Sequence, residues 1–309
     1  MKSSRRGMPC VCRVGWQATL LSGREVLPSH SAHARHASTG RRIAGLTSTE
    51  HAGPTPYSEV NILLLTLLTR VQMILREKLV GFYLYGSLSL GDFDPASSDI
   101  DFLVVTTEDL SGTTLEELRD MHASIASSGL PYATRLEGSY IPRVALRRYD
   151  PHNASHPTIG VDWEFHVGHH ESHWVIERFI VREHGIIVWG PSPKELIDPI
   201  PPSALREAVC EKLRIFWQAQ LSGPAWLRPR DYQAFAVLTL CRALYTLKQG
   251  TIVSKPEAAA WACQALGPEW QPIIKRALIW RQQHAEDDLR ETLDFLHFAI
   301  AYGLELCSQ

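Results

Sequence analysis

The stretch Gly86-Ser-Leu-Ser-Leu-Gly-Asp-Phe-Asp-Pro-Ala-Ser-Ser-Asp-Ile-Asp101 decides the fold of this 309-residue chain. It lies between two predicted strands, 80–85 and 100–105, whose residues are mainly β-branched, aromatic or aliphatic. Gly86 allows the backbone to approach a ligand closely, and the amides that follow point out of a predicted helix start. Together with the hydroxyl of Ser87, this turn predicts a cradle for phosphate groups.

The other end of the stretch carries a pair of acids. Asp99 and Asp101 are two residues apart on a predicted strand, so both carboxylates emerge on one face, whereas Ile100 and Phe102 face the core. Neighbouring anions repel each other unless a cation neutralises them, and Mg²⁺ binds carboxylates together with substrate phosphates. An isolated pair of this kind is usually a solvated strand end. Because a phosphate cradle precedes this pair, the sequence predicts a metal site.

The pattern along the chain changes from mixed to helical near residue 200. We expect a third strand over 132–141 and a helix followed by a strand within 166–188. After this point, five stretches with apolar residues at helical spacing are separated by prolines: 205–219, 232–249, 255–266, 270–283 and 287–306. The predicted fold class is therefore α+β, with a mixed-sheet domain over 54–198 and an all-helical bundle over 199–309.

Residues 1–53 differ from the rest of the chain in composition. They are rich in Ser, Arg, His and Gly, and residues 1–50 carry eight Lys/Arg against two Glu. Such a composition cannot bury a core and predicts a disordered extension. A transit peptide has a similar composition, but an unstructured extension or a start assigned too far upstream is the preferred interpretation.

The body of the chain is acidic, with 23 Lys/Arg against 31 Asp/Glu in residues 51–309, a net charge of −8. This balance disfavours nucleic acid as a partner and suits a cationic substrate. No apolar run approaches the ~18 residues of a membrane span, so we expect no membrane association. The six scattered cysteines suit neither a zinc ribbon nor a disulfide framework. We expect free thiols, a cytoplasmic location and a monomer.

The Gly-Ser turn, its spacer and the Ser-Asp-Ile-Asp segment together resemble the signature of the polymerase-β-like nucleotidyltransferases. The branch that this chain resembles over about residues 56–305 is that of the aminoglycoside adenylyltransferases. The resemblance implies that Gly86 and Ser87 bind the phosphates of ATP and that Asp99 and Asp101 bind Mg²⁺, with two ions expected. Glu137, in Arg135-Leu-Glu-Gly-Ser-Tyr-Ile141, resembles the glutamate that serves these enzymes as general base.

Several segments of the second half resemble the same branch. Lys255 matches a lysine that reaches the nucleotide phosphates, and Trp163 falls in a loop that stacks on substrate in these enzymes. Arg242 is a lone charge on an apolar predicted helix, so it either forms an interdomain ion pair or contacts a ligand. The spacing of His169 and His173 is that of a helical metal site, but without a Glu-x-x-His signature a structural or solvated role is preferred for the histidines of 166–173.

The region that would receive the acceptor departs from the resembling enzymes. Streptomycin- and spectinomycin-modifying members carry acidic residues there, whereas this chain has Asp231 as its only acid, beside Arg228 and Arg230. We expect these arginines to repel a cationic drug and to weaken resistance, unless they turn away and leave Asp231 to bind it.

The sequence thus predicts a Mg²⁺-dependent transferase that moves AMP from ATP to a hydroxyl group of a small molecule, with an aminoglycoside-like acceptor as one candidate. Two alternatives remain open. The same chemistry could act on another metabolite or on a protein side chain. The chain could also be a catalytically silent nucleotide-binding or antitoxin-like module.

Overall fold

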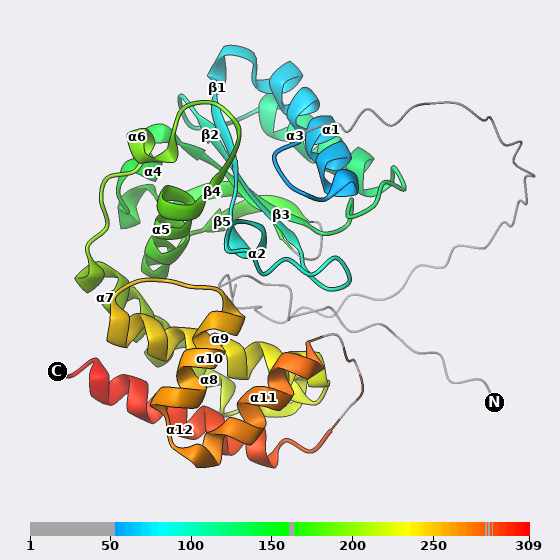
Figure 1. The fold of residues 1–309 in the computed structure, drawn as a ribbon. Coiled ribbons are helices and arrows are strands. Elements are labelled where there is room, and N and C mark those ends of the chain that lie inside the picture. Colours follow the sequence, from blue (N-terminus) through cyan, green and yellow to red (C-terminus); the bar gives the residue numbers. More distant parts are fainter. Residues whose placement is uncertain (1–52, 161–163, 282, 284, 286) are drawn as a thin grey trace, which may run out of the picture.

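A mixed β-sheet and a bundle of helices form two lobes of the chain (Figure 1). The computed structural model describes residues 53–160, 164–281, 283, 285 and 287–309. We call the sheet with helices α1 to α6 the sheet lobe, and helices α7 to α12 the helical lobe. The predicted α+β fold, a mixed sheet followed by a helical bundle, is confirmed.

Six strands of the described chain form one sheet in the order β5-β4-β3-β2-β1-β6. The β2–β3 pair is parallel, and the other neighbouring pairs are antiparallel. The strands are β1 (Leu79–Leu84), β2 (Ile100–Thr106), β3 (Leu136–Pro142), β4 (Ser155–Ile159), β5 (Phe165–His169) and β6 (Ile186–Trp189). The sequence analysis did not identify β4 and β5, because histidine, proline and glycine dilute their β-branched pattern. It also began β3 too early: residues 131–134 form turns, and Tyr132 has a φ of 61°.

Helices α1 (Ser58–Leu75) and α3 (Thr113–Ala126) cover one face of the sheet. Leu63, Leu67 and Val71 recur at helical spacing on α1 and belong to one buried cluster with Phe82 and Phe102 of the sheet. Ile100 is fully buried in the same cluster. This confirms the prediction that the residues alternating with the acid pair face the core, which leaves the acids on the opposite face.

Helix α1 also satisfies the length and composition criteria of a membrane span. The helical stretch Ser58–Lys78 contains an 18-residue window with a mean hydropathy of 1.4, and 33% of this window is buried. The sequence analysis found no such run, because Asn61 and Thr66 interrupt the apolar residues. In the fold, the buried side of α1 packs on the sheet, while Ile62 and Leu65 are exposed.

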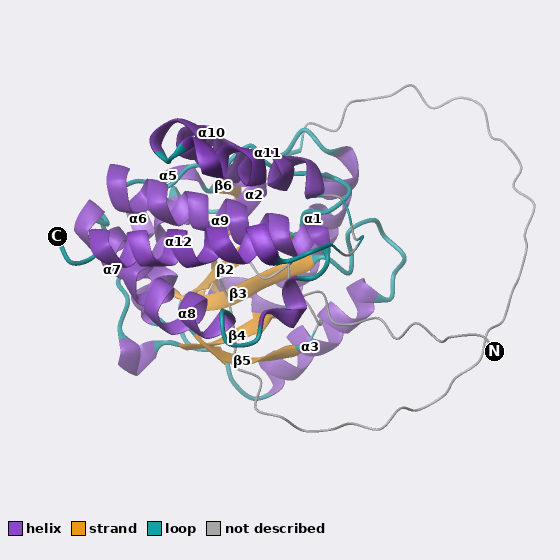
Figure 2. Ribbon diagram, turned by 90° about the horizontal axis from the view of Figure 1, so that it is seen from below, coloured by secondary structure: helices purple, strands orange, loops and turns teal. Residues whose placement is uncertain are grey.

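The second face of the sheet packs against the shorter helices of the sheet lobe and against the helical lobe. The shorter helices of the sheet lobe are α2 (Gly86–Ser89), α4 (Arg143–Arg147), α5 (Val175–His184) and α6 (Pro193–Leu196). The helices of the helical lobe are α7 (Pro202–Lys212), α8 (Gln218–Gln220), α9 (Arg230–Gln249), α10 (Lys255–Ala265), α11 (Gln271–Trp280) and α12 (Arg290–Leu306). Viewed from below, the helical lobe lies across the sheet (Figure 2).

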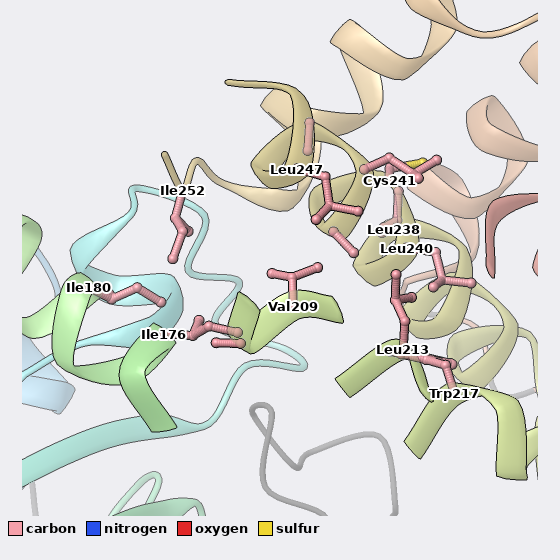
Figure 3. Packing of buried hydrophobic residues seen from close by; sticks show 14 of the residues in the cluster. Ile176, Ile180, Val209, Leu213, Trp217, Leu238, Leu240, Cys241, Leu247 and Ile252 are labelled. Carbon is pink, nitrogen blue, oxygen red and sulfur yellow. The ribbon is translucent and has the colours of Figure 1, made fainter. Parts of the chain in front are cut away.

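The two lobes share one hydrophobic core. Ile176 and Ile180 of α5 belong to the same buried cluster as Val209 of α7 and Leu238 of α9 (Figure 3). All four side chains are at most 2% exposed. Burying them together stabilises the contact between lobes, since each buried aliphatic side chain contributes about 1.5–3 kcal/mol.

A disulfide joins Cys210 of α7 to Cys307 at the end of α12, with a Cα–Cα distance of 5.9 Å. The expectation of free thiols is therefore wrong for this pair, although Cys241 and Cys263 are free. The two bonded residues are 97 positions apart. Only the packing of α12 against the π-helical segment η5 (Leu213–Trp217), which continues α7, brings them together.

Candidate active site

The turn after β1 combines a glycine with one of the predicted metal ligands. Gly86 has a φ of +63°, and a Cβ at this position would lie 1.8 Å from Oδ2 of Asp101. The amide of Tyr85 donates a hydrogen bond of 3.1 Å to the carbonyl oxygen of Asp101. Glycine is therefore required here twice, for its backbone conformation and for the space that the carboxylate occupies. The turn predicted to bind phosphate therefore lies directly against Asp101, one of the two predicted metal ligands.

The third predicted acid lies beside the pair. In the parallel register of β2 and β3, Asp101 is opposite Glu137, so their side chains leave the sheet on the same face. Glu137 is 5% exposed. Burial raises the pKa of the nearby Tyr85 well above its usual value, and the charges of Asp101, Glu177 and Glu137 raise it further. Glu137 is thus within electrostatic reach of the pocket, although it is not one of the residues that line it.

A pocket lies between the two lobes, next to the Gly86–Ser87 turn. Acids from both lobes and bases from the helical lobe line it. The sheet lobe contributes Ser87 and four acids, Asp92, Asp99, Asp101 and Glu177. The helical lobe contributes one acid and three bases, Asp231, Arg242, Lys255 and Arg281. Of the predicted site residues, the structure brings Gly86, Ser87, Asp99, Asp101, Lys255 and Asp231 to this one pocket.

The acid pair has the chemistry of a magnesium site. Burial raises the pKa of Asp101 to about 7, against the opposing charge of Lys255. Such a buried carboxylate is stabilised in its charged form by a cation. Among the described residues, no three His, Cys, Asp or Glu side chains gather as ligands of one ion. Mg²⁺ in proteins is usually held by one or two carboxylates together with phosphate oxygens and water, and Asp99 and Asp101 fit that ligand set.

Two cations of the helical lobe face the acids. Lys255 is the first residue of α10, whose N-cap Ser254 accepts a hydrogen bond from the amide of Glu257 at 3.3 Å. Its Nζ lies 4.8 Å from the centre of the Phe235 ring. Arg242 of α9 is 7% exposed and lines the pocket. Arg242 thus lies at the pocket and at the contact between lobes, and its two predicted roles, an interdomain ion pair or a ligand contact, stay predictions.

The two arginines beside Asp231 do not line the pocket. Arg230 donates to Asp287 at 3.0 Å and to Gln283 at 3.0 Å, and Arg228 is exposed to solvent. Asp231 faces the pocket and is 8% exposed. The geometry thus favours the second sequence-based alternative, in which the arginines turn away and Asp231 remains at the pocket.

Sequence analysis missed two features of the pocket. Arg281 donates from Nη1 to Oδ1 of Asp92 at 2.6 Å and from Nη2 to its carbonyl oxygen at 3.4 Å, which joins the two lobes across the pocket. Glu177 of α5 is a buried acid on the sheet-lobe side. Asp92 lies within the quoted stretch, but no spacing in the sequence indicates its partner, which is 189 residues away.

Two further predictions concerned Trp163 and the histidines of residues 166–173. Trp163 lies outside the described residues. His169 ends β5, and His173 lies in the 3-10 segment η4 (Ser172–Trp174), so the two do not share a helix. His170 is instead a buried histidine, stacked on Trp174 at 4.0 Å and hydrogen-bonded to Ser139 at 3.1 Å. This supports a structural role for it.

Two family models match the chain, one in each lobe. The model of the nucleotidyltransferase domain matches residues 68–139, which contain the cradle and all three acids. The model of the aminoglycoside adenylyltransferase C-terminal domain matches residues 195–302, which contain the pocket-lining bases.

Named adenylyltransferases match most of the chain. An aminoglycoside (3'') (9) adenylyltransferase from Shigella flexneri is 30% identical over 259 residues, which are 79% of this chain and 94% of the relative. A spectinomycin 9-adenylyltransferase from Campylobacter jejuni is 25% identical over 215 residues, 67% of this chain and 79% of the relative. In fold, the chain is similar to the spectinomycin adenyltransferase of Enterococcus faecialis, whose structure was solved with ATP and spectinomycin. The TM-score is 0.60 at 19% identity, over 80% of this chain and 99% of that one.

Proposed function

This chain belongs to the aminoglycoside adenylyltransferase family, and we propose that it transfers AMP from MgATP to a hydroxyl group of an aminoglycoside antibiotic. One observation carries the proposal. A single pocket joins the acids of the sheet lobe to the bases of the helical lobe, with Asp231 at the same pocket and Arg230 paired elsewhere. Such a pocket between lobes is a common location for a ligand site.

The nucleotide would lie with its phosphates at the Gly86–Ser87 turn. The turn amides and the side chains of Arg242 and Lys255 would bind the phosphate oxygens, because positive groups are needed where the triphosphate enters a buried acidic pocket. Asp99 and Asp101 would hold the Mg²⁺, and we propose two ions. The metal, when bound, supplies positive charge to the phosphates and orients them.

Glu137 would act as the general base. It would take the proton of the acceptor hydroxyl as that oxygen forms a bond to the α-phosphorus, while the bond from this phosphorus to the bridging oxygen of pyrophosphate breaks. The proton passes to the Glu137 carboxylate, and pyrophosphate leaves with the bonding electrons. The position of Glu137 opposite Asp101 in the sheet supports this role, because phosphates held by a metal at Asp101 would lie near this base.

The acceptor would be a polyamine drug for electrostatic reasons. Asp231 and the net charge of −8 over residues 51–309 attract cations, and the charge of Arg230 is balanced by Asp287. The names of the relatives point to the same acceptors. We also propose that the enzyme works as a cytoplasmic monomer. Light scattering on the purified protein tests the monomer.

Pyrophosphate release with MgATP, measured against streptomycin, spectinomycin, other aminoglycosides and hydroxylated compounds without amino groups, tests the function. We expect turnover only with the cationic drugs. Asp231→Asn should raise the KM for the drug by roughly tenfold and leave the KM for ATP unchanged, because one charge contact at a desolvated site is worth about that factor. Asp120→Asn, an exposed acid on α3, is the matched control.

Other results would favour the alternative functions. Turnover only with uncharged hydroxyl compounds would indicate a different metabolite as acceptor. Protein adenylylation without a drug would indicate a protein side chain. No pyrophosphate release with any acceptor, together with intact ATP binding, would favour the silent module.

A further inference from the structure

Glu177 is a buried acid for which the proposed mechanism has no use. It lies on α5 in the sheet lobe, is 2% exposed and lines the pocket between the lobes. Both carboxylate oxygens are buried, and no side chain of the described residues donates a hydrogen bond to them. A carboxylate in this situation costs several kcal/mol unless opposite charges compensate it. We therefore asked which charges surround Glu177.

Two cations of the helical lobe oppose Glu177. Lys212, 3% exposed, lies at the end of α7 on the face that also carries the buried Leu205 and Val209. Arg242, 7% exposed, lies on α9 one turn after Leu238, and both of these residues line the pocket. The charges thus come from three helices, α5 in one lobe and α7 and α9 in the other. Helices α5 and α7 pack directly on each other.

The electrostatic coupling of the three groups is mutual. Burial raises the pKa of Glu177 to about 7, and the charges of Lys212 and Arg242 oppose that rise. Burial lowers the pKa of Arg242 to about 10 and that of Lys212 to about 7. For each base, Glu177 is the strongest opposing charge. Glu177 is therefore the main acid that stabilises the charged form of Arg242 before a phosphate is present.

The two bases differ in one respect that matters for function. Arg242 lines the pocket with Asp101 and Lys255, whereas Lys212 does not line it. With all three groups charged, the cluster keeps one positive charge, and the arginine presents it to the pocket. Lys212, which does not line the pocket, opposes the charge of Glu177, so the three charges together leave one positive charge for a triphosphate to meet.

We propose that Glu177 is a positioning residue that holds Arg242 of the helical lobe at the phosphate end of the pocket, with Lys212 as its buried counter-charge. The proposal rests on nucleotidyl transfer and not on the identity of the acceptor. Its test is accordingly made on ATP binding without any acceptor, so that a wrong acceptor assignment and a wrong role for Glu177 give different results.

The test is isothermal titration calorimetry of the full chain with Mg²⁺ and the α,β-methylene analogue of ATP. We expect Glu177→Gln to weaken binding by roughly tenfold or more, because it removes the buried charge that opposes Arg242. The KM for ATP should rise in parallel, while kcat and the KM for the acceptor change only a few-fold. Glu183→Gln is the matched control, because Glu183 lies on the same helix and pairs with Arg182 and Lys194 outside the pocket.

A double-mutant cycle separates positioning from simple structural support. In an Arg242→Met background, Glu177→Gln should cause little further loss of nucleotide affinity, because its effect passes through the arginine. Losses that add fully would overturn the proposal, as would wild-type affinity in a folded Glu177→Gln protein. An effect confined to the acceptor KM would make Glu177 a direct acceptor ligand instead. If Glu177→Gln does not fold, Glu177→Gln/Lys212→Met, which removes both opposite charges, is measured with the same expected loss and the same contradicting results.

Discussion

The two walls of the pocket differ in charge and in construction. The sheet-lobe wall is acidic, and its Asp101 lies on a strand that pairs with the strand of Glu137, an acid next to the wall. The helical-lobe wall carries the bases Arg242, Lys255 and Arg281, which come from α9, α10 and the segment after α11. Strand pairing fixes the positions of the acids relative to one another, whereas the positions of the bases depend on how the helices pack. We infer that the sheet lobe sets the rate of the chemical step and the helical lobe sets nucleotide affinity.

The largest effect should come from the acid pair. Asp101→Asn, and likewise Asp99→Asn, should reduce pyrophosphate release by on the order of 10³ or more, because metal-borne charge stabilisation is worth several kcal/mol. The fold should persist, since Asp101 is buried at a cost that raises its pKa to about 7, and the amide removes that cost. Circular dichroism and Mn²⁺ binding by electron paramagnetic resonance check the fold and the metal site. Wild-type turnover in both variants would refute the metal-site hypothesis.

Glu137→Gln should come next and should affect kcat alone. We expect kcat to fall by roughly 10² to 10⁴, the usual contribution of a general base, with ATP affinity within a few-fold of wild type. Steady-state kinetics and calorimetry measure the two quantities separately. If ATP binding is lost to the same extent as kcat, Glu137 is a metal ligand rather than a base.

Lys255→Met tests the opposite wall. We expect the KM for ATP to rise about tenfold, the value of one charge-assisted phosphate contact, with kcat changed only a few-fold. Lys275→Met is the control, because Lys275 is exposed on α11. A loss of kcat as large as that of Glu137→Gln would contradict the inference that the helical lobe sets nucleotide affinity and not the rate of the chemical step.

The smallest effect should come from the ion pair that joins the walls. Arg281 and Asp92 have side chains that are 23% and 10% exposed, so their contact is partly screened and contributes about 1 kcal/mol. Arg281→Gln should raise the KM for ATP about two- to fivefold. Asp92→Asn/Arg281→Gln should be no worse than the single variant, as kinetics on both will show. A loss above a hundredfold for Arg281→Gln alone would make Arg281 a direct phosphate ligand.

The two walls of the pocket also differ in how far their residues could be predicted from the sequence. Gly86, Ser87, Asp99 and Asp101 lie within sixteen consecutive residues, so local rules of turn and strand geometry place them together. Lys255 and Asp231 were found only through a family resemblance. Glu177, Arg281 and the Cys210–Cys307 bond were not found, because their partners are distant in sequence and no local pattern encodes them.

The fold shows the same limit. Apolar periodicity predicted the helices of the helical lobe, since an amphipathic helix carries its signal within its own residues. Strands β4 and β5 lack such a signal, because their place depends on pairing with each other and with β3.

The sequence by itself determined the composition of the sheet-lobe wall: a strand, a glycine turn and a second strand with alternating acids bring the turn that we propose binds phosphate and the carboxylates to one face. Only the tertiary structure decided which charges oppose them. The sequence left open whether Arg228 and Arg230 face the pocket, and helix packing turned Arg230 toward Asp287 and brought Arg242 opposite Glu177. The physical reason is the distance in sequence over which each interaction acts. Backbone geometry acts between neighbours in the chain, whereas charge compensation in a buried interface acts between any groups that the fold brings together.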